Sequence, residues 1–277
     1  MIPSVDITIP AGSIIITPYD RLERKKRVER EAQRKLRRAY NNELGHFYFA
    51  HEDCTQSIKP QTLSRLLFLA TYLGYNSNIL YRTERKFLKK SDLPALLKLK
   101  SNTFYKFWNE VSGHYIFEQT DGTLKMSPLF CRGKLKHQNK KESTNGYQQI
   151  YIEALRQLYW QTPVSKHCHL GYIFEMLPHI NWEYNLLCWN SSEKDLEKVE
   201  LMTIDELCAI IGYSKSQRAR LWNACQQLKF QDSGRIHNLV SFVPGNDLQF
   251  GNMRIFINPR VIYRGSNWHR VEILGAF

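Results

Sequence analysis

The chain has 277 residues, 43% of them hydrophobic, and carries 39 Lys and Arg against 26 Asp and Glu, a formal net charge of +13. The length predicts about two domains, and the hydrophobic fraction excludes an intrinsically disordered chain. No apolar run reaches the roughly 20 residues that span a bilayer, and no signal peptide is recognisable. We therefore expect a soluble, cytoplasmic protein without a membrane partner. The positive charge favours a polyanion, nucleic acid first.

The N-terminal region is expected to form an arm and a basic helix. Residues 1–19 contain three prolines and are predicted to be extended, whereas residues 20–40 carry ten Lys and Arg with no Gly or Pro. This composition predicts a helix with Asp20 as its N-cap. Its apolar stripe is thin, so the helix either projects into solvent or lies on an anionic partner. The candidate phosphate contacts are Arg24, Lys25, Lys26, Arg27, Arg34, Lys35, Arg37 and Arg38.

The rest of the chain alternates between apolar periodic segments and polar connections. Helices are predicted at 63–74, 90–98, 101–111 and 150–160, with a β-like stretch at 114–130 and polar segments at 133–147 and 191–200. The predicted organisation is an arm and basic helix (1–42), a first unit (43–135), a linker (136–149) and a second unit (150–277).

The sequence contains an internal repeat. Residues 88–111 align with residues 202–225 without gaps, at a constant offset of 114. Leu93 then falls on Leu207, and Trp108-Asn109 on Trp222-Asn223. The β-like segments that follow, 121–134 and 251–266, both end in Pro, a few apolar residues and Arg-Gly. We interpret this pattern as a tandem duplication.

Each repeat has the pattern of a helix-turn-helix. In the second copy, Leu207, Ile210 and Ile211 face inward at i, i+3, i+4 spacing, and Gly212 is the expected C-cap. Ser214 or Lys215-Ser216 opens the next helix, whose buried stripe is Leu221, Trp222 and Cys225. The strands that follow would form a wing. The predicted fold class is mainly α with small β wings (α+β), as tandem winged helix-turn-helix units after a basic helix.

Two segments carry a resemblance to a known group of proteins. They are MTIDELCAIIGYSKSQRARLWNACQQL (202–228) and RIFINPRVIYRG (254–265). They resemble winged-helix replication proteins of the RepL type and MarR-like regulators of Gram-positive plasmids and phages. The resemblance covers roughly 150–270 and, more weakly, 60–135. It implies a winged-helix fold, duplex DNA as partner and a bacterial host cell.

The second helix of each unit supplies the candidate DNA-reading residues, because in a helix-turn-helix this helix enters the major groove. Arg pairs bidentately with guanine, and Gln or Asn with adenine. The second unit offers Lys215, Ser216, Gln217, Arg218, Arg220 and Asn223, with Arg254 on its wing. The first offers Ser101, Asn102, Thr103, Tyr105, Lys106 and Asn109. Arg132 and Arg264 either bind phosphate or cap the wing strand.

Catalytic arrangements are not recognisable. The sequence has no P-loop, no GxSxG, no HExxH and no Rossmann glycine pattern. His167-Cys168-His169 has the outline of a nicking-enzyme metal motif, but Cys is an unusual centre, and neighbouring side chains of an extended segment diverge. The six cysteines form no CxxC and are expected to be reduced. We therefore predict a non-enzymatic protein without cofactor or metal.

The expected function is selective double-stranded DNA binding by a phage- or plasmid-type transcription regulator. One alternative is a replication initiator that binds an origin and recruits replication proteins. The other is an interaction protein that grips host RNA polymerase or another host factor. Dimerisation through the 20–40 helix stays open. Charge reversal at Arg218 and Arg220 separates the DNA-binding functions from the third.

Overall fold

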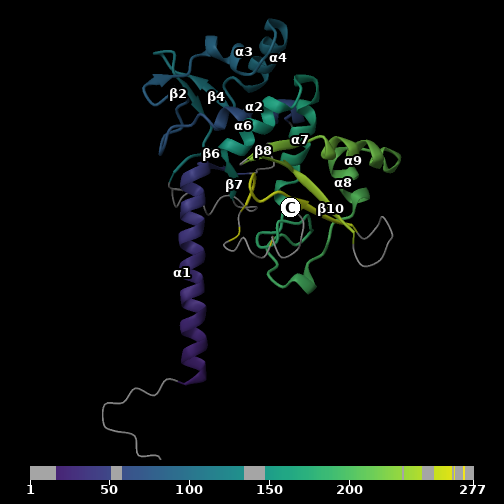
Figure 1. The fold of residues 1–277 in the computed structure, drawn as a ribbon. Coiled ribbons are helices and arrows are strands. Elements are labelled where there is room, and N and C mark those ends of the chain that lie inside the picture. Colours follow the sequence, from purple (N-terminus) through teal and green to yellow (C-terminus); the bar gives the residue numbers. More distant parts are fainter. Residues whose placement is uncertain are drawn as a thin grey trace, which may run out of the picture.

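The structure is a computed structural model that describes residues 17–50, 58–133, 147–232, 234–244, 253–263, 265 and 271. It combines helices with small antiparallel sheets (Figure 1). A long helix, α1 (Pro18–Leu44), precedes two parts that we call the first half (residues 46–133) and the second half (residues 147–265). The mixed α+β class expected from the sequence is confirmed.

Helix α1 stands away from the rest of the protein, on the side opposite the labelled helices α3, α4, α8 and α9 (Figure 1). It begins two residues before Asp20. Thr17 Oγ1 accepts a hydrogen bond from the backbone N–H of Asp20 (3.1 Å), and the Asp20 carboxylate accepts from the backbone N–H of Thr17 (2.9 Å). The predicted N-cap was therefore wrong: Thr17 caps the helix, and Asp20 is its capping-box partner.

The base of α1 is anchored on the protein body. Asn41 Oδ1 accepts hydrogen bonds from Gln149 Nε2 (2.8 Å) and from the Tyr151 hydroxyl (3.1 Å). Leu44 packs against a small cluster that contains Tyr151 and Tyr263. These contacts among the described residues fix the C-terminal end of the projecting helix.

The two halves contain the elements in similar order. The first half has β1 (His46–Ala50), α2 (Pro60–Ala70), β2 (Tyr81–Thr83), β3 (Lys86–Phe87), α3 (Leu93–Leu96), α4 (Ser101–Val111), β4 (Ile116–Glu118), β5 (Leu124–Met126) and β6 (Phe130–Cys131). The second half has β7 (Tyr147–Tyr151), α6 (Ile152–Gln161), α7 (His167–Glu175), α8 (Ile204–Ile211), α9 (Arg218–Gln226), β8 (Lys229–Asp232), β9 (Arg235–Asn238), β10 (Val240–Val243) and β11 (Arg254–Ile257). Short 3₁₀ turns at 90–92, 164–166, 177–179, 196–198 and 215–217 complete the described elements.

Equivalent residues of the two halves make the same hydrogen bonds. The backbone carbonyl of Asn78 accepts from Met126 N (2.7 Å), and its side-chain Nδ2 donates to Met126 O (3.2 Å). Asn185 makes both bonds with Ile257, each at 3.0 Å. The correspondence continues with Leu80 N to Leu124 O (2.9 Å) and Leu187 N to Ile255 O (2.8 Å). The segment after α2 (residues 78–80) therefore pairs with β5, and the segment after α7 (residues 185–187) pairs with β11 in the same register.

The central strands of the two halves are related by a local two-fold axis. After its β4–β5 or β10–β11 strand pair, each half returns to one central sheet. Strand β6 pairs with β1, and Ile262 bridges Ile150 of β7. Strands β1 and β7 themselves pair antiparallel, with Tyr48 opposite Gln149 at the middle. Because equivalent strands that pair antiparallel are exchanged by a rotation of half a turn about their midpoint, the axis passes close to this pair.

Helices α2 and α7, which are equivalent in the two halves, cross in close contact. A Cβ atom on Gly171 of α7 would overlap the backbone carbonyl of Pro60, so only glycine permits this approach. Helix α6 braces the same region, where Tyr159 stacks on Phe68 of α2 with ring centres 3.9 Å apart. One hydrophobic core extends through both halves.

Several boundaries differ from those expected. The linker predicted over 136–149 overlaps β7, which begins at Tyr147, and residues 134–146 lie outside the described residues. The predicted helix 90–98 is a 3₁₀ turn followed by the four-residue α3, and the helix at 63–74 begins at Pro60 and ends at Ala70. The helix at 101–111 is confirmed as α4.

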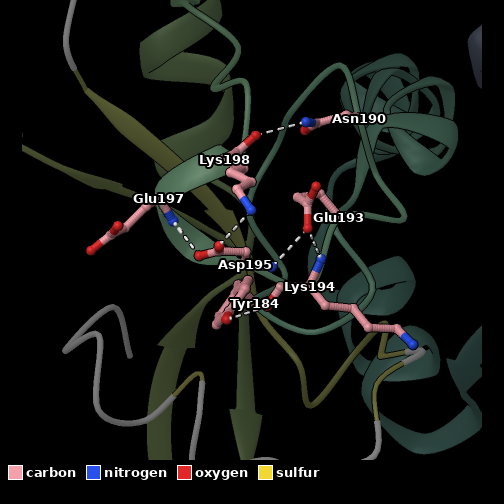
Figure 2. A network of polar contacts seen from close by, with 7 residues as sticks. All are labelled: Tyr184, Asn190, Glu193, Lys194, Asp195, Glu197 and Lys198. Carbon is pink, nitrogen blue, oxygen red and sulfur yellow. Dashed lines mark hydrogen bonds and ion pairs between the residues drawn. The ribbon is translucent and has the colours of Figure 1, made fainter.

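The connection between residue 187 and α8 in the second half is long, and hydrogen bonds join its residues to one another (Figure 2). The Tyr184 hydroxyl donates to the carbonyl of Lys194 (2.8 Å), and Asn190 Nδ2 donates to that of Lys198 (2.8 Å). The Glu193 carboxylate accepts backbone hydrogen bonds from Lys194 (2.7 Å) and Asp195 (2.8 Å). These contacts hold the connection as a compact surface loop.

His167-Cys168-His169 opens α7 rather than lying in an extended segment. His167 is buried, and its Nε2 lies 3.0 Å from the carbonyl of Thr162. Burial lowers the pKa of His167 to about 4, so its ring is neutral in the folded protein at neutral pH. His167 is therefore a neutral, buried side chain that packs against Tyr159, with ring centres 4.2 Å apart.

Glu175 in the last turn of α7 makes stability depend on pH. Burial raises the pKa of its carboxyl group to about 7. The unfolded chain ionises this group at lower pH, so its contribution to stability falls as pH rises from about 4.5 to about 7. We expect Glu175→Gln to raise the free energy of unfolding by about 2 kcal/mol more at about pH 8 than at about pH 5. Urea unfolding at both pH values measures the difference, and an equal gain at both would contradict it.

Candidate nucleic-acid interface

Capping residues that are close in sequence set the ends of α8 and the start of the next helix. Thr203 Oγ1 accepts from the backbone N–H of Glu206 (3.2 Å), which starts α8. Gly212 ends it in a left-handed conformation with φ of +79°. Ser214 and Gln217 then form the capping box that opens the next helix. The predicted C-cap and the predicted opening at Ser214 are both confirmed.

Helix α9 has the buried and exposed faces expected from the sequence. Leu221 and Cys225 are buried, and Trp222 is partly buried, stacked on Phe242 with ring centres 4.0 Å apart. The exposed side chains of the 3₁₀ turn at 215–217 and of α9 include Lys215, Ser216, Arg218, Arg220 and Asn223. These side chains form a polar, cationic surface that we call the α9 face.

Three predicted reading residues already have partners within the protein. Gln217 Oε1 accepts the backbone N–H of Ser214 (3.1 Å), so this side chain caps the helix. Arg218 Nε lies 3.5 Å from Asp205 Oδ1 on α8. Arg220 lies over the ring of Tyr213, 5.5 Å from its centre. Lys215 and Arg220 are therefore the cations of the α9 face without a carboxylate partner among the described residues.

Helix α4 presents a similar face with different chemistry. Phe107, Trp108 and Val111 are buried, as predicted for Trp108. The exposed side chains are Ser101, Asn102, Thr103, Tyr105, Lys106 and Asn109, which we call the α4 face. Tyr105 has 66% of its surface exposed. The α4 face carries one cation where the α9 face carries three.

The remaining predicted residues lie outside these two faces. Arg132 is half-buried and its Nη1 donates to the carbonyl of Leu73 (2.9 Å), so it ties chain segments together. Arg254 is partly exposed at the start of β11, and Arg264 lies outside the described residues. On α1 the side chains of Arg24, Lys25, Lys26, Arg27, Arg34, Lys35 and Arg38 are exposed, and that of Arg37 is outside the described set.

A hairpin that the sequence did not single out follows α9 directly. Strands β8 and β9 pair from Lys229–Asn238 to Asp232–Arg235, and Ile236 has 74% of its surface exposed. The Asp-Ser-Gly sequence at 232–234 is the turn signal that marks it. Arg235 on this hairpin is a further exposed cation, and it follows α9 closely in the sequence.

The described residues contain no group of three or more His, Cys, Asp and Glu side chains that could hold a metal ion. Within the same part of the chain, no helix is both long enough and apolar enough to span a membrane. No protein family, no curated protein and no solved structure matches this chain.

Proposed function

We propose that this protein is a non-enzymatic, selective double-stranded-DNA-binding protein that acts as a transcription regulator and contains two winged helix-turn-helix units. The observation that carries the proposal is the recurrence of one helix pair, with an exposed polar second helix, in two halves whose central strands pair about a local two-fold axis. In this reading α3 and α4 with the β4–β5 hairpin form one unit. Helices α8 and α9 with β10 and β11 form the other.

The two-fold relation supports an inverted arrangement of half-sites. In two-fold symmetric helix-turn-helix dimers, the recognition helices enter successive major grooves about 34 Å apart, so their operators are palindromic. Here one chain carries both helices, α4 and α9. A single copy would therefore read two inverted half-sites about one helical turn apart.

The two half-sites would differ in sequence because the two faces differ in chemistry. Lys215 and Arg220 on the α9 face suit guanine, which offers O6 and N7 acceptors in the major groove. Asn102 and Asn109 on the α4 face suit adenine, which pairs with an amide. The proposed site is thus guanine-containing on the α9 side and richer in adenine on the α4 side.

Helix α1 would add affinity without selectivity, because its exposed cations lie away from both faces. Replacing Arg24, Lys25, Arg34 and Lys35 with Gln should weaken binding equally for specific and unrelated DNA. The slope of log affinity against log salt should become shallower by about 0.9 for each phosphate that these side chains no longer neutralise. Fluorescence anisotropy over a salt series measures both quantities. Weakening confined to the specific site would contradict this role.

The experiment that tests the proposed function is a genomic-library pull-down with the full chain at about 50 mM and about 200 mM salt. We expect one discrete site to remain enriched at the higher salt and to lie at a promoter. Enrichment inside a replication origin would favour the initiator function instead. Uniform binding that vanishes with salt would contradict selective recognition and favour a role in binding host proteins.

A further inference from the structure

A cavity of about 560 Å³ opens where the end of α2, the turn after it and strand β2 of the first half meet helix α6 of the second half. Its volume is within the range of small-molecule sites in proteins. The residues that bear on its chemistry are Arg82, Arg132, Arg156, Tyr72, Tyr75 and Ser77. Neither face of the proposed DNA interface contributes to it.

Two arginines line the wall and have no carboxylate partner among the described residues. Arg156 donates from Nε to Thr71 Oγ1 (3.0 Å) and from Nη2 to Thr71 O (2.9 Å), while Arg132 donates from Nη1 to Leu73 O (2.9 Å). Among the described residues neither has a carboxylate within ion-pair distance. Burial and the positive charge of Arg156 lower the pKa of Arg132. The wall therefore favours an anion.

The other lining groups add a hydroxyl and aromatic rings. The Ser77 hydroxyl is buried and has no hydrogen-bond partner in the described part of the chain. Tyr75 at the turn has 68% of its surface exposed, and the Tyr72 ring lies under Arg156, with the guanidinium carbon 4.4 Å from the ring centre. Two acids moderate the charge: Arg82 pairs with Asp92 (3.2 Å), and Glu84 lies on the lining.

In the second half, the turn after α7 corresponds to the turn after α2 that lines the cavity. The turn after α7 is covered by the loop of Figure 2: Trp182 N donates to Ser191 O (3.0 Å), and Asn181 Nδ2 donates to Glu193 O (2.9 Å). In the first half the connection from Leu80 to α3 is shorter and instead forms the β2–β3 hairpin.

We propose that this cavity binds a free mononucleotide, with its phosphate against Arg132 and Arg156 and its base against Tyr75. Paired guanidinium groups recognise phosphate through charge-assisted hydrogen bonds, and aromatic side chains stack on any base. Because Arg132 follows β6 and Arg156 belongs to α6, the bound phosphate would contact both halves. The site is independent of the proposed DNA binding.

The test is isothermal titration of the full chain with adenosine monophosphate and with inorganic phosphate, at constant ionic strength. We expect one saturable site that binds the nucleotide more tightly. Arg156→Gln should weaken both probes at least about tenfold, the loss of one hydrogen bond to a charged group. Tyr75→Ala should weaken only the nucleotide.

The matched control is Arg24→Gln, which removes the same charge from α1 and should leave both affinities unchanged. Equal weakening by Arg24→Gln, the absence of a saturable site, or equal affinity for the two probes would overturn the proposal. Binding of short oligonucleotides without binding of the mononucleotide would overturn it as well, because the cavity would then be a contact for nucleic acid.

Discussion

Gly171→Ala is expected to lower the free energy of unfolding by about 3 kcal/mol, because a Cβ atom at this position would overlap the backbone of Pro60 where α2 and α7 cross. Helix propensity acts in the opposite direction, since Ala is preferred over Gly in a helix by about 1 kcal/mol. A net loss therefore measures the steric cost of separating the two helices. Urea unfolding of the full chain gives the value.

A second glycine provides the scale for this experiment. Gly212 ends α8, where a Cβ atom would meet nothing within 4 Å, and its φ is +79°. Gly212→Ala should therefore cost only the left-handed strain, about 1 kcal/mol. If Gly171→Ala were neutral or stabilising, the close crossing that joins the halves would be contradicted.

The largest effect on DNA binding is expected from the double reversal Lys215→Glu and Arg220→Glu. Both side chains are exposed on the α9 face without a carboxylate partner among the described residues. Removing a base contact costs about 1–3 kcal/mol, and the introduced carboxylates also repel phosphate. We expect affinity for the enriched site to fall about a thousandfold, measured by fluorescence anisotropy.

The control carries the same change of charge on another surface. Lys194→Glu with Lys198→Glu alters the closed loop of Figure 2, whose residues belong to neither face. This variant should lose only the general, salt-dependent part of the affinity. An equal loss in both double variants would mean that net charge alone, rather than the α9 face, determines binding.

Local signals made part of this fold predictable. The left-handed Gly212 and the capping residue Ser214 are encoded within a few residues, so the α8–α9 turn could be located from the sequence. The Ser-x-x-Gln pattern also encodes the capping role of Gln217, a residue that was predicted to contact DNA instead. The N-cap of α1 was misassigned because Thr17 lies in a segment that was predicted to be an extended arm.

Long-range contacts account for the features that were not predicted. The segment at 147–149 has the composition of a polar linker, yet Gln148 and Gln149 are buried, because Gln148 donates to Leu177 O (2.8 Å) and Gln149 to Asn41 (2.8 Å). Pairing of β1 with β7 joins residues far apart in sequence, which periodicity does not reveal. The anchoring of Arg132 on Leu73 and its proximity to Arg156 arise in the same way.

The most direct test of the central claim is a hydroxyl-radical footprint of the full chain on the site enriched in the pull-down, combined with guanine methylation interference. We predict two protected segments with centres about one helical turn, or roughly 10 base pairs, apart. Their sequences should be related by inversion, and interference should be confined to the guanine-containing half. A single protected segment, or two segments arranged as a direct repeat, would contradict binding by two units related by a two-fold axis.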